Sequence, residues 1–550
     1  MTVQRQNSDT ELPEFPIRGP FGGIQSELPV EAIEKYGFAD SLNMLYRRGT
    51  CRVRPALNSI PLVGAPPEIG NLYGTIASLT STIADFPPYT GPVCGFADFF
   101  ASNGTRLQVA ALPTALYQYI GGAWSQVTGV LTGTATNHYS FAVVGQKLCF
   151  SQGVDPVRMW DGITAGFSVS SASAVPAYFL FELANHLIAL RTVEGGSIAY
   201  QRLRWTGAGD PTDWTSFDAG VSDLFNDLGP INGGLKLFQS GYVWQQNGIV
   251  QMIPTGTAAE PFYLLPLSAK SKGLTCQYSL VANGESIASY VGKDNIYNFD
   301  GTSSTPIGDQ PLQGRSRLGA RSRIFADLMQ ATPNSILGFV TTSINGNTFN
   351  AYWLVIPNVS VWIYNYEEMN WARWSIAGNI TAIGEFSATS AIRIQDLVGT
   401  IAAQLWTPAT LTNNNPFDSV VLGFADGSAY NFDFTGWSEQ PWSVTTGQLA
   451  YGDYRHEKTT VKTRLIYQDH GPATVNFSLT SDSGQVVSNT PTQPDGLTLG
   501  GINAGASITD VITHDQISGK YTTLQMSGAA GQPFEFSEVA PIYNPGGEAR

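Results

Sequence analysis

Charged side chains are scarce in this sequence. Asp, Glu, Lys and Arg make up 13 % of its 550 residues, about half of the roughly 25 % typical of soluble proteins. Positive charge is the scarcer sign, with 29 Lys and Arg against 43 Asp and Glu and a formal net charge of −14. Neutralising phosphates requires Lys and Arg. The acidic balance therefore argues against a protein whose whole surface binds nucleic acid.

Cysteine and histidine are also rare. The four cysteines, Cys51, Cys94, Cys149 and Cys276, form no Cys-x-x-Cys pair, so zinc ligation has no support and isolated buried thiols are expected. The five histidines share no metal-ligand spacing. We therefore expect no metal and no cofactor.

Long apolar runs and catalytic motifs are missing. No stretch of about eighteen apolar residues predicts a membrane-spanning helix, and the first thirty residues lack the pattern of a secretory signal. The sequence contains no phosphate-binding loop, zinc-protease motif, calcium loop or nucleophile elbow. Glu367 and Glu368 lie in an expected turn. The simplest interpretation is that both carboxylates are exposed to solvent and are not catalytic. We expect no catalytic residues and no enzymatic activity.

Short strands separated by turns dominate residues 70 to 440. The chain contains 58 Gly, and 43 % of its residues are hydrophobic, enough for a large core. Helical periodicity is rare, and its best example is 321–330, which is followed by Pro333. Many short strands with regular turn signals predict an all-β fold: a sandwich, a barrel or a propeller.

A loose repeat decides among these folds. Each unit has two apolar strands, then an aromatic residue, an Asp or Asn, a Gly and a short outer strand. Seven copies occur, at 105–129, 138–162, 178–215, 235–256, 286–308, 337–374 and 420–437. One such sheet cannot bury both of its faces, so the units are expected to close into a ring. We predict a β-propeller of six or seven blades over 66–440; the alternative is an irregular stack of β-sandwiches.

The two ends of the chain differ from this repeat. After residue 440 the pattern becomes a clean alternation, with Val461, Thr463, Leu465 and Tyr467 on one face of a strand. We predict an added C-terminal β-sandwich-like domain over 441–550. Residues 1–65 are rich in Gly and Pro at first and then contain alternating arginines, which indicates an N-terminal arm and a docking strand.

Arginine is concentrated in two places. One is the expected strand around residues 51–54, which is either a solvated edge strand or an arm that docks on an acidic partner. The other is the segment 313–323, which is either a solvated loop or a contact with a neighbouring acidic subunit or with DNA. Arginine suits both roles because its guanidinium makes bidentate contacts with carboxylates and phosphates. The candidate contact residues are Arg52, Arg54, Arg315, Arg317, Arg321 and Arg323.

Aromatic residues beside Asp and Gly recur in the repeat. The examples are Trp160-Asp161-Gly162, Trp205 with Asp210-Pro211 and Trp214, and Phe299-Asp300-Gly301. Such sets are either stacking platforms for a ligand or blade-to-blade packing with hairpin corners. We favour the structural interpretation.

Four motifs, taken in order, resemble a known family. They are GPFGGIQSELP with the Arg-x-Arg-Pro strand that follows it, VRMWDG, RLRWTGAGDPTDWT, and DYRHEKTTVKTRLIYQDHGPATVNFSLTSDSG. The chain resembles the tail nozzle proteins of short-tailed bacteriophages, also called packaged-DNA stabilisation or tail-hub proteins. The motifs are spread over most of the chain, and the blades between 220 and 440 match in general style.

The resemblance implies a structural virion protein. It would form a ring, expected to be a homohexamer, below the portal and adaptor. Genomic double-stranded DNA would pass through the lumen without sequence specificity, and the packaged genome would be retained until infection. Tail fibres or spikes are further implied partners. The protein would be assembled in the bacterial host cytoplasm and would end in the virion tail.

Two alternatives remain open. A polysaccharide-degrading propeller would need two carboxylates facing one cleft, and the sequence does not locate such a pair. A receptor-binding propeller would present sugar-stacking aromatic residues at its blade ends. The N-terminal Gly-Pro segment and the arginine-rich strand favour the nozzle.

Overall fold

The computed structural model describes most of the chain. The described residues are 13–19, 21–28, 32–33, 36–60, 91–120, 123–267, 271–312, 316–344, 347–386, 419–433, 437–451, 455–468, 470, 473–489 and 507–545. The predicted all-β fold is confirmed: antiparallel sheets dominate, and α1 (Arg321–Leu328) is the single α-helix among the described residues.

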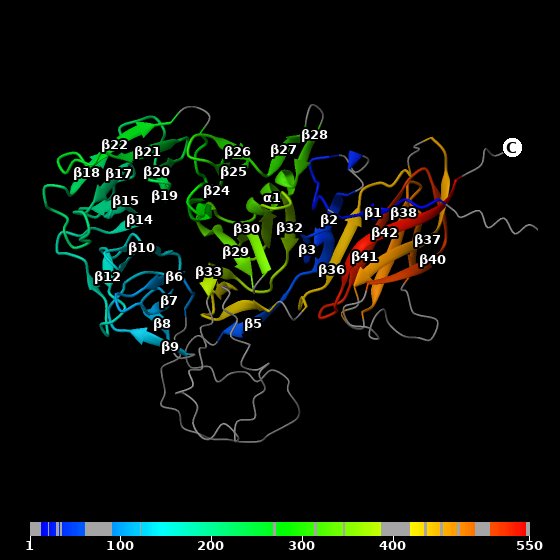
Figure 1. Ribbon diagram of the computed structural model, residues 1–550, viewed down its shortest axis with the longest axis horizontal. Coiled ribbons are helices and arrows are strands. Elements are labelled where there is room, and N and C mark those ends of the chain that lie inside the picture. Colours follow the sequence, from blue (N-terminus) through cyan, green and yellow to red (C-terminus); the bar gives the residue numbers. More distant parts are fainter. Residues whose placement is uncertain are drawn as a thin grey trace, which may run out of the picture.

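Seven sheets of the described chain form a ring of blades, seen face-on in Figure 1. In blades 1 to 6 the strands follow sequence order from the axis outward, as in an up-and-down meander. Blade 1 contains β6 (Gly95–Phe100), β7 (Arg106–Ala111), β8 (Leu116–Ile120) and β9 (Ala123–Val127); blade 2 contains β10 (Ser140–Val144), β11 (Lys147–Ser151), β12 (Arg158–Trp160) and β13 (Ser168–Val169); blade 3 contains β14 (Ala177–Leu183), β15 (His186–Glu194), β17 (Arg202–Trp205) and β18 (Gly220–Asp223), with β16 (Ser197–Ile198) beside β15.

Blades 4 to 6 repeat this order, and blade 7 departs from it in its outer strand. Blade 4 contains β19 (Ile231–Leu237), β20 (Ser240–Gln245), β21 (Ile249–Pro254) and β22 (Phe262–Pro266); blade 5 contains β23 (Val281–Asn283), β24 (Ile287–Val291), β25 (Ile296–Phe299) and β26 (Ser304–Pro306); blade 6 contains β29 (Leu337–Ile344), β30 (Asn347–Ile356), β31 (Ser360–Asn365) and β32 (Asn370–Trp374); blade 7 contains β33 (Ile380–Phe386), β34 (Ser419–Phe424), β35 (Ala429–Asp433) and β5 (Ala56–Ile60). A hairpin, β27 (Asp309–Leu312) and β28 (Ser316–Gly319), lies with α1 and η3 (Pro333–Ser335) between blades 5 and 6.

Blade 7 closes the ring with a strand from the opposite end of the chain. Its fourth strand is β5, which pairs antiparallel with β35, Asn58 opposite Asn431. Its innermost strand, β33, contacts β6 of blade 1. The unit predicted at 420–437 therefore obtains its outer strand from residues 56–60, which sequence order alone did not indicate.

The axis of the propeller is crossed by η2 (Gln277–Ser279), which precedes blade 5. The ring of Tyr278 lies 4.5 Å from that of His138, which precedes blade 2, and 5.9 Å from that of Phe179 in blade 3. Blades 2 and 5 lie on opposite sides of the ring, so this contact spans its centre. Burial lowers the pKa of His138 to about 4, so its ring is neutral at physiological pH.

Two further sheets form a sandwich beside blade 6 (Figure 1). One sheet orders β3 (Met44–Arg47), β4 (Thr50–Val53), β42 (Glu535–Pro545), β37 (Lys458–Gln468) and β40 (Ser507–Gly519), with β1 (Ile17–Arg18) on β42; the other orders β2 (Phe38–Leu42), β36 (Trp442–Thr446), β41 (Thr522–Gly528), β38 (Val475–Ser481) and β39 (Val486–Asn489). In place of a separate arm over 1–65, strands β1 to β4 belong to the sandwich and β5 to the propeller. Apolar residues of β2 and β3 pack both within the sandwich and against blade 6.

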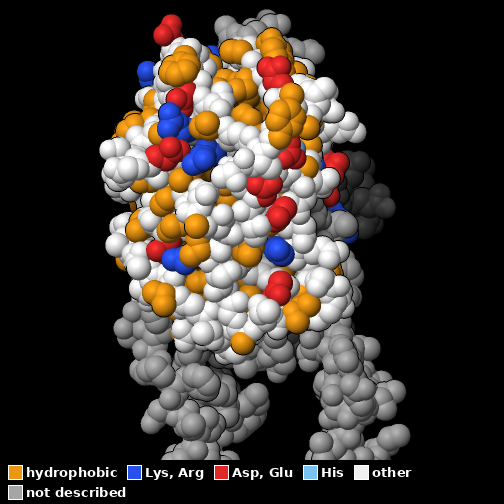
Figure 2. All heavy atoms as spheres, turned by 90° about the vertical axis from the view of Figure 1, so that its left-hand side faces the viewer, with side chains coloured by type: hydrophobic (Ala, Val, Ile, Leu, Met, Phe, Trp, Pro, Cys, Tyr) orange, Lys and Arg blue, Asp and Glu red, His pale blue; other side chains and the backbone are white. Residues whose placement is uncertain are grey.

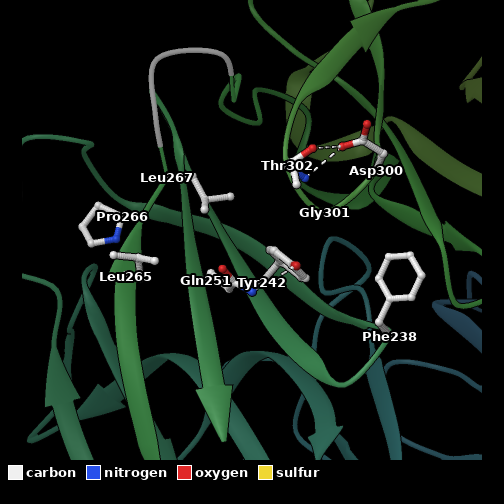
Figure 3. Close-up of a pocket in the computed structure, with 9 residues that line it drawn as sticks. All are labelled: Phe238, Tyr242, Gln251, Leu265, Pro266, Leu267, Asp300, Gly301 and Thr302. Atoms are coloured by element: carbon white, nitrogen blue, oxygen red, sulfur yellow. Dashed lines mark hydrogen bonds between the residues drawn. The ribbon is translucent and has the colours of Figure 1, made fainter.

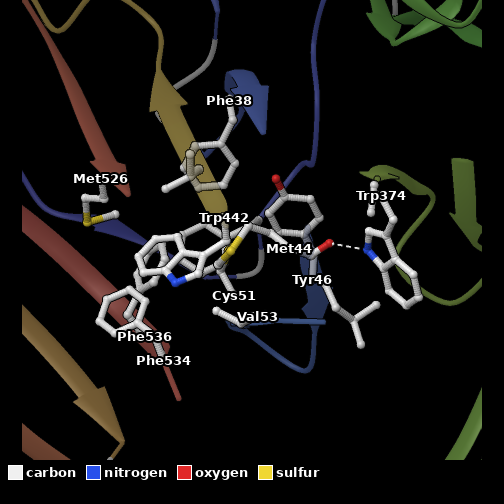
Figure 4. Packing of buried hydrophobic residues seen from close by; sticks show 14 of the residues in the cluster. Phe38, Met44, Tyr46, Cys51, Val53, Trp374, Trp442, Met526, Phe534 and Phe536 are labelled. Atoms are coloured by element: carbon white, nitrogen blue, oxygen red, sulfur yellow. Dashed lines mark hydrogen bonds between the residues drawn. The ribbon is translucent and has the colours of Figure 1, made fainter. Parts of the chain in front are cut away.

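One hydrophobic core runs from the sandwich into blades 6 and 7. It joins Phe38, Tyr46 and Phe536 of the sandwich to Trp374 and Phe432 of the propeller. The indole Nε1 of Trp374 donates a hydrogen bond of 2.7 Å to the carbonyl of Met44 (Figure 4). A shared core of this kind resists the relative motion expected between domains that meet through small polar interfaces.

Arg54 lies where the chain leaves the sandwich for the propeller. Its side chain is fully buried and its guanidinium forms a two-pronged ion pair with Glu439, with N–O distances of 2.6 and 3.2 Å. It also donates to the carbonyls of Pro55 and Ser375 and to the amide oxygen of Asn43. One planar cation thus joins the N-terminal strands, the segment between blades 6 and 7, and the segment after the propeller.

Replacing Arg54 with Met tests this junction. The substitution leaves two carbonyls and the Asn43 amide oxygen without their donor, whereas the Glu439 carboxylate is 39 % exposed and can be solvated by water. Leaving buried acceptors without a partner costs about 1–3 kcal/mol. We expect the free energy of unfolding, measured by guanidinium denaturation, to fall by that amount. The control is Arg18→Met, because Arg18 pairs with Glu538 but is 58 % exposed, which predicts a loss below about 1 kcal/mol. Equal losses in the two variants would contradict the assigned role.

Candidate functional site

The arginine-rich segment forms the hairpin β27–β28 and the helix α1. In Figure 1 the hairpin stands at the rim of the ring, next to α1. Arg315 lies outside the described residues, and Arg317 belongs to β28, where its side chain is not described. The sequence prediction of a helix here is confirmed, with its end at Leu328.

A buried carboxylate fixes α1 to blade 6. Asp327 is 4 % exposed. It accepts two hydrogen bonds from the guanidinium of Arg373, at 2.9 and 3.0 Å, one from Ser360 Oγ at 2.6 Å and one from the Trp362 indole at 2.9 Å. Ile324 bears on the same side of the helix and is also buried. The outward side of α1 is therefore held in a fixed position.

Arg321 and Arg323 have different environments, although they lie two residues apart. Arg323 forms an ion pair of 2.9 Å with Asp40, so its charge is matched within the chain. Arg321 donates from Nε to the carbonyl of Asp294 at 2.6 Å and lies over the ring of Phe325 at 5.5 Å. No ion pair of Arg321 is found among the described residues. Of the two α1 arginines, Arg321 is thus the one with charge to offer a partner.

The N-terminal Gly-Gly segment braces this region, a role that the sequence analysis missed. Ser26 donates its amide to the carbonyl of Gly319, and the Glu27 carboxylate accepts from the amide of Ser322. Gly23 makes the approach possible: its φ is +67°, and a Cβ there would lie 2.7 Å from the carbonyl oxygen of Trp371. The glycine pair in the sequence was the available signal, since only a backbone without side chains fits so closely.

The other two candidate arginines do not lie on an open surface. Arg54 is fully buried in the junction already described, so docking through Arg54 on another molecule is replaced by an internal role. Arg52 lies over the ring of Trp437 at 4.9 Å and opposite Glu535 in the sheet. Burial lowers the pKa of its guanidinium, which nevertheless stays charged at neutral pH.

The outward side of α1 combines a cation with apolar surface. We call it the helix surface; it consists of Arg321, Phe325, Ala326, Met329 and Gln330. Met329 is 83 % exposed. Arg, Met and aromatic residues are enriched in the cores of protein–protein interfaces. The helix surface is therefore suited to a partner protein with acidic and apolar side chains.

The aromatic-Gly sets of the first blades have structural partners. Trp160 is 2 % exposed, packs on Phe99 at 5.7 Å and donates to the carbonyl of Thr164. Trp214 is 4 % exposed and donates to Ser170 Oγ. Neither indole presents a face to a ligand.

The described residues offer few candidates for a metal site or a reactive thiol. Over the ranges that the structure describes, no group of three His, Cys, Asp or Glu side chains could hold a metal ion. Burial raises the pKa of Cys94, Cys149 and Cys276 to about 12, so these thiols are protonated at neutral pH. No helix in the described part of the chain is long and apolar enough to span a membrane.

The end of the ring away from the sandwich carries mixed charge. Figure 2 shows acidic and basic side chains interspersed there with hydrophobic ones over a largely uncharged surface. The net negative charge is therefore not gathered into one acidic field on this face.

Comparison with known proteins identifies no family and gives only weak structural similarity. No family model and no curated protein matches the chain. Among solved structures, the extracellular domain of a hybrid two-component system from B. thetaiotaomicron is 10 % identical with a TM-score of 0.37, covering 76 % of this chain and 46 % of that one. The C-terminal WD40 domain of Sif2 is 10 % identical (TM-score 0.33, 62 % and 81 %), and exo-β-1,3-galactanase from Phanerochaete chrysosporium is 11 % identical (0.25, 84 % and 99 %). The chain thus spans less than half of the first of these proteins.

Replacing Asp327 with Ala tests the anchoring of α1. The change removes the acceptor of four hydrogen bonds and leaves the Arg373 guanidinium, 21 % exposed, without its carboxylate. The cost is expected to be about 3 kcal/mol, the lower end of the range for breaking a buried ion pair. We expect that loss in the free energy of unfolding, together with faster amide hydrogen exchange in α1. Ala326→Ser, on the exposed side of the same helix, is the control and should change stability by no more than about 0.5 kcal/mol. Unchanged exchange in the Asp327 variant would show that other contacts hold the helix.

Proposed function

We propose that this chain is a structural protein of a bacteriophage tail nozzle. It forms a homohexameric ring below the portal and adaptor, provides the exit channel for double-stranded DNA and retains the packaged genome until infection. The observation that carries the proposal is the position of the N-terminal motif. The Gly-Gly segment and the Arg-x-Arg-Pro strand, which carry the family resemblance, contact the sandwich, blade 6 and α1.

A rigid junction between sandwich and propeller suits the wall of a channel that must hold back a packed genome. Among the described residues, sandwich and propeller meet through the shared core and the Arg54 junction, which disfavour a hinge between them. An enzyme that closes on a substrate gains from such a hinge, whereas a ring that holds back a packed genome gains from its absence. We accordingly propose a role without catalytic turnover.

The exit channel lies between copies of the chain in this proposal. The contact of 4.5 Å between Tyr278 and His138 crosses the propeller axis, and a double helix cannot pass such a contact. A lumen therefore requires a ring of several chains. Closed ring symmetry is the common form of homo-oligomers.

The helix surface serves as a contact with the adaptor or with the next subunit. Its fixed orientation reduces the ordering cost of association, because the side chains are held on an anchored helix. Arg321 supplies the charge that an acidic partner recognises, and Met329 supplies apolar area.

The mass of the assembly tests the proposal first. Light scattering on the purified protein, with and without portal and adaptor rings, should give about 355 kDa for six copies of the 59.1 kDa chain. A hexamer that forms alone or only on the portal complex agrees with the nozzle. A protein that stays monomeric or trimeric and never joins those rings refutes it, and polysaccharide cleavage would then be the next measurement.

Charge reversal at Arg321 tests the helix surface separately. Arg321→Glu should weaken association with the adaptor or the neighbouring subunit about tenfold or more, because like charges then oppose each other. Lys520→Glu introduces the same change at an exposed site on the sandwich and should leave association unaltered. Equal association of both variants would remove the helix surface from the interface without refuting the ring.

A further inference from the structure

A pocket of about 450 Å³ opens at the seam between blades 4 and 5 (Figure 3). Its walls come from the β19–β20 turn and the second, third and fourth strands of blade 4 and from the β25–β26 turn of blade 5. Phe238, Tyr242, Gln251, Leu267 and Asp300 are among its lining residues. Its volume lies within the range of about 300–1,000 Å³ found for small-ligand sites.

Phe238 presents an aromatic ring at the side of this pocket in an unfavourable backbone conformation. Its φ is +53°, a left-handed value that bulky residues rarely adopt. Its amide donates a hydrogen bond of 2.7 Å to the carbonyl of Glu285 in blade 5, which holds it in place. Its ring is nevertheless half exposed. A glycine would be the better residue here on structural grounds alone, so the exposed ring needs another reason.

Tyr242 places a hydroxyl group deep in the same pocket. The residue is 4 % exposed. Its oxygen accepts a hydrogen bond of 3.3 Å from Gln251 Nε2, and a Cβ on Gly301 would lie only 3.1 Å from it. Burial and the nearby charge of Asp300 raise the pKa of Tyr242, so the hydroxyl keeps its proton. No acceptor for that proton is found within the described ranges, which leaves a buried donor unused.

Asp300 supplies acceptor oxygens at the rim. Burial opposes its charge, but hydrogen bonds from the backbone and side chains of Ser303 and Thr302 outweigh burial and hold the pKa of its carboxyl below the ordinary value. Oδ1 accepts three of these bonds at 2.8 Å, whereas Oδ2 accepts one long bond of 3.3 Å from Ser303. Oδ2 therefore retains capacity for another donor. Among the described residues that line the pocket there is no Lys or Arg.

We propose that this pocket binds a neutral pyranose ring of a glycan. A sugar ring has an apolar face of C–H groups, which would pack on Phe238 and Leu267, and hydroxyl groups at its edge. Those hydroxyls can accept from Tyr242 and donate to Asp300. The lone carboxylate disfavours phosphates, nucleotides and acidic sugars. The inference does not depend on the nozzle, because it rests on the pocket of a single chain.

A peptide fits the same surface less well. An added strand would have to pair with β22, the outer strand of blade 4, whose last residue at the pocket is Pro266. Proline has no amide hydrogen to donate, so the edge is interrupted where the pocket lies. An apolar peptide also leaves the Tyr242 donor unused.

Saturation-transfer NMR on the full chain tests the proposal. The probes are the methyl pyranosides of glucose, galactose, mannose and N-acetylglucosamine, each at about 20 mM, a concentration that detects dissociation constants on the order of 1 mM. At least one is expected to bind. Phe238→Gly should weaken binding at least about tenfold without loss of stability, because glycine tolerates the left-handed backbone. Tyr242→Phe, which removes only the hydroxyl, should weaken it about five- to tenfold.

Phe225→Ala is the matched control, since Phe225 is 91 % exposed and does not line the pocket; its affinity should equal that of the parent chain. The proposal fails if no neutral pyranoside of the panel binds, or if the Phe238 and Tyr242 variants bind like the parent. It also fails if glucose 6-phosphate or an apolar peptide binds here in preference to the neutral sugars.

Discussion

The pairing of β5 with β35 is the constraint on which the rest of the structure depends. It completes blade 7, and with blade 7 complete the innermost strands of the seven blades support one another around the axis. Arg54 lies two residues before β5, so the strand that closes the ring and the residue that attaches the sandwich are next to each other in the chain. Weakening the β5–β35 pairing or the Arg54 junction is therefore expected to destabilise both the propeller and the sandwich. The hydrophobic core and the polar junction both extend across the boundary between them.

The blades could be predicted because their signals are local. A strand, a tight corner containing Asp and Gly, and another strand lie within a few tens of residues, and each turn identifies itself through side-chain hydrogen bonds such as those that Asp161 accepts from its neighbours. The alternation over 461–467 was equally readable: Thr463, Leu465 and Tyr467 are buried, and only Val461, at a bulge, departs from the pattern. These signals require no knowledge of distant partners.

The remaining features depend on distant partners. Nothing local in residues 56–60 distinguishes the last strand of a propeller from a strand of an arm. Arg52 and Arg54 alternate in the same way in the sequence, yet Arg54 is buried because Glu439 lies beside it in space. Arg321 and Arg323 differ for the same reason, since Asp40 reaches only the second. The pocket lies between two blades and includes the turn at Asp300, which the sequence analysis interpreted as a hairpin corner. Only the structure shows that Asp300 and Tyr242 line the same pocket.

The position of the closing strand β5 in the sequence also affects how the structure forms during synthesis. Residues 56–60 emerge from the ribosome long before residues 429–433, and at about 5–20 residues per second the interval is roughly 20 to 75 s. During this interval the edges of the N-terminal strands have no partners. The same holds for the sandwich strands that pair with β42, which is synthesised last. Such an edge pairs with whatever complementary strand it meets first. In a cell that makes many copies at once, the neighbouring chain competes with the chain's own end, and an exchanged strand would link two propellers.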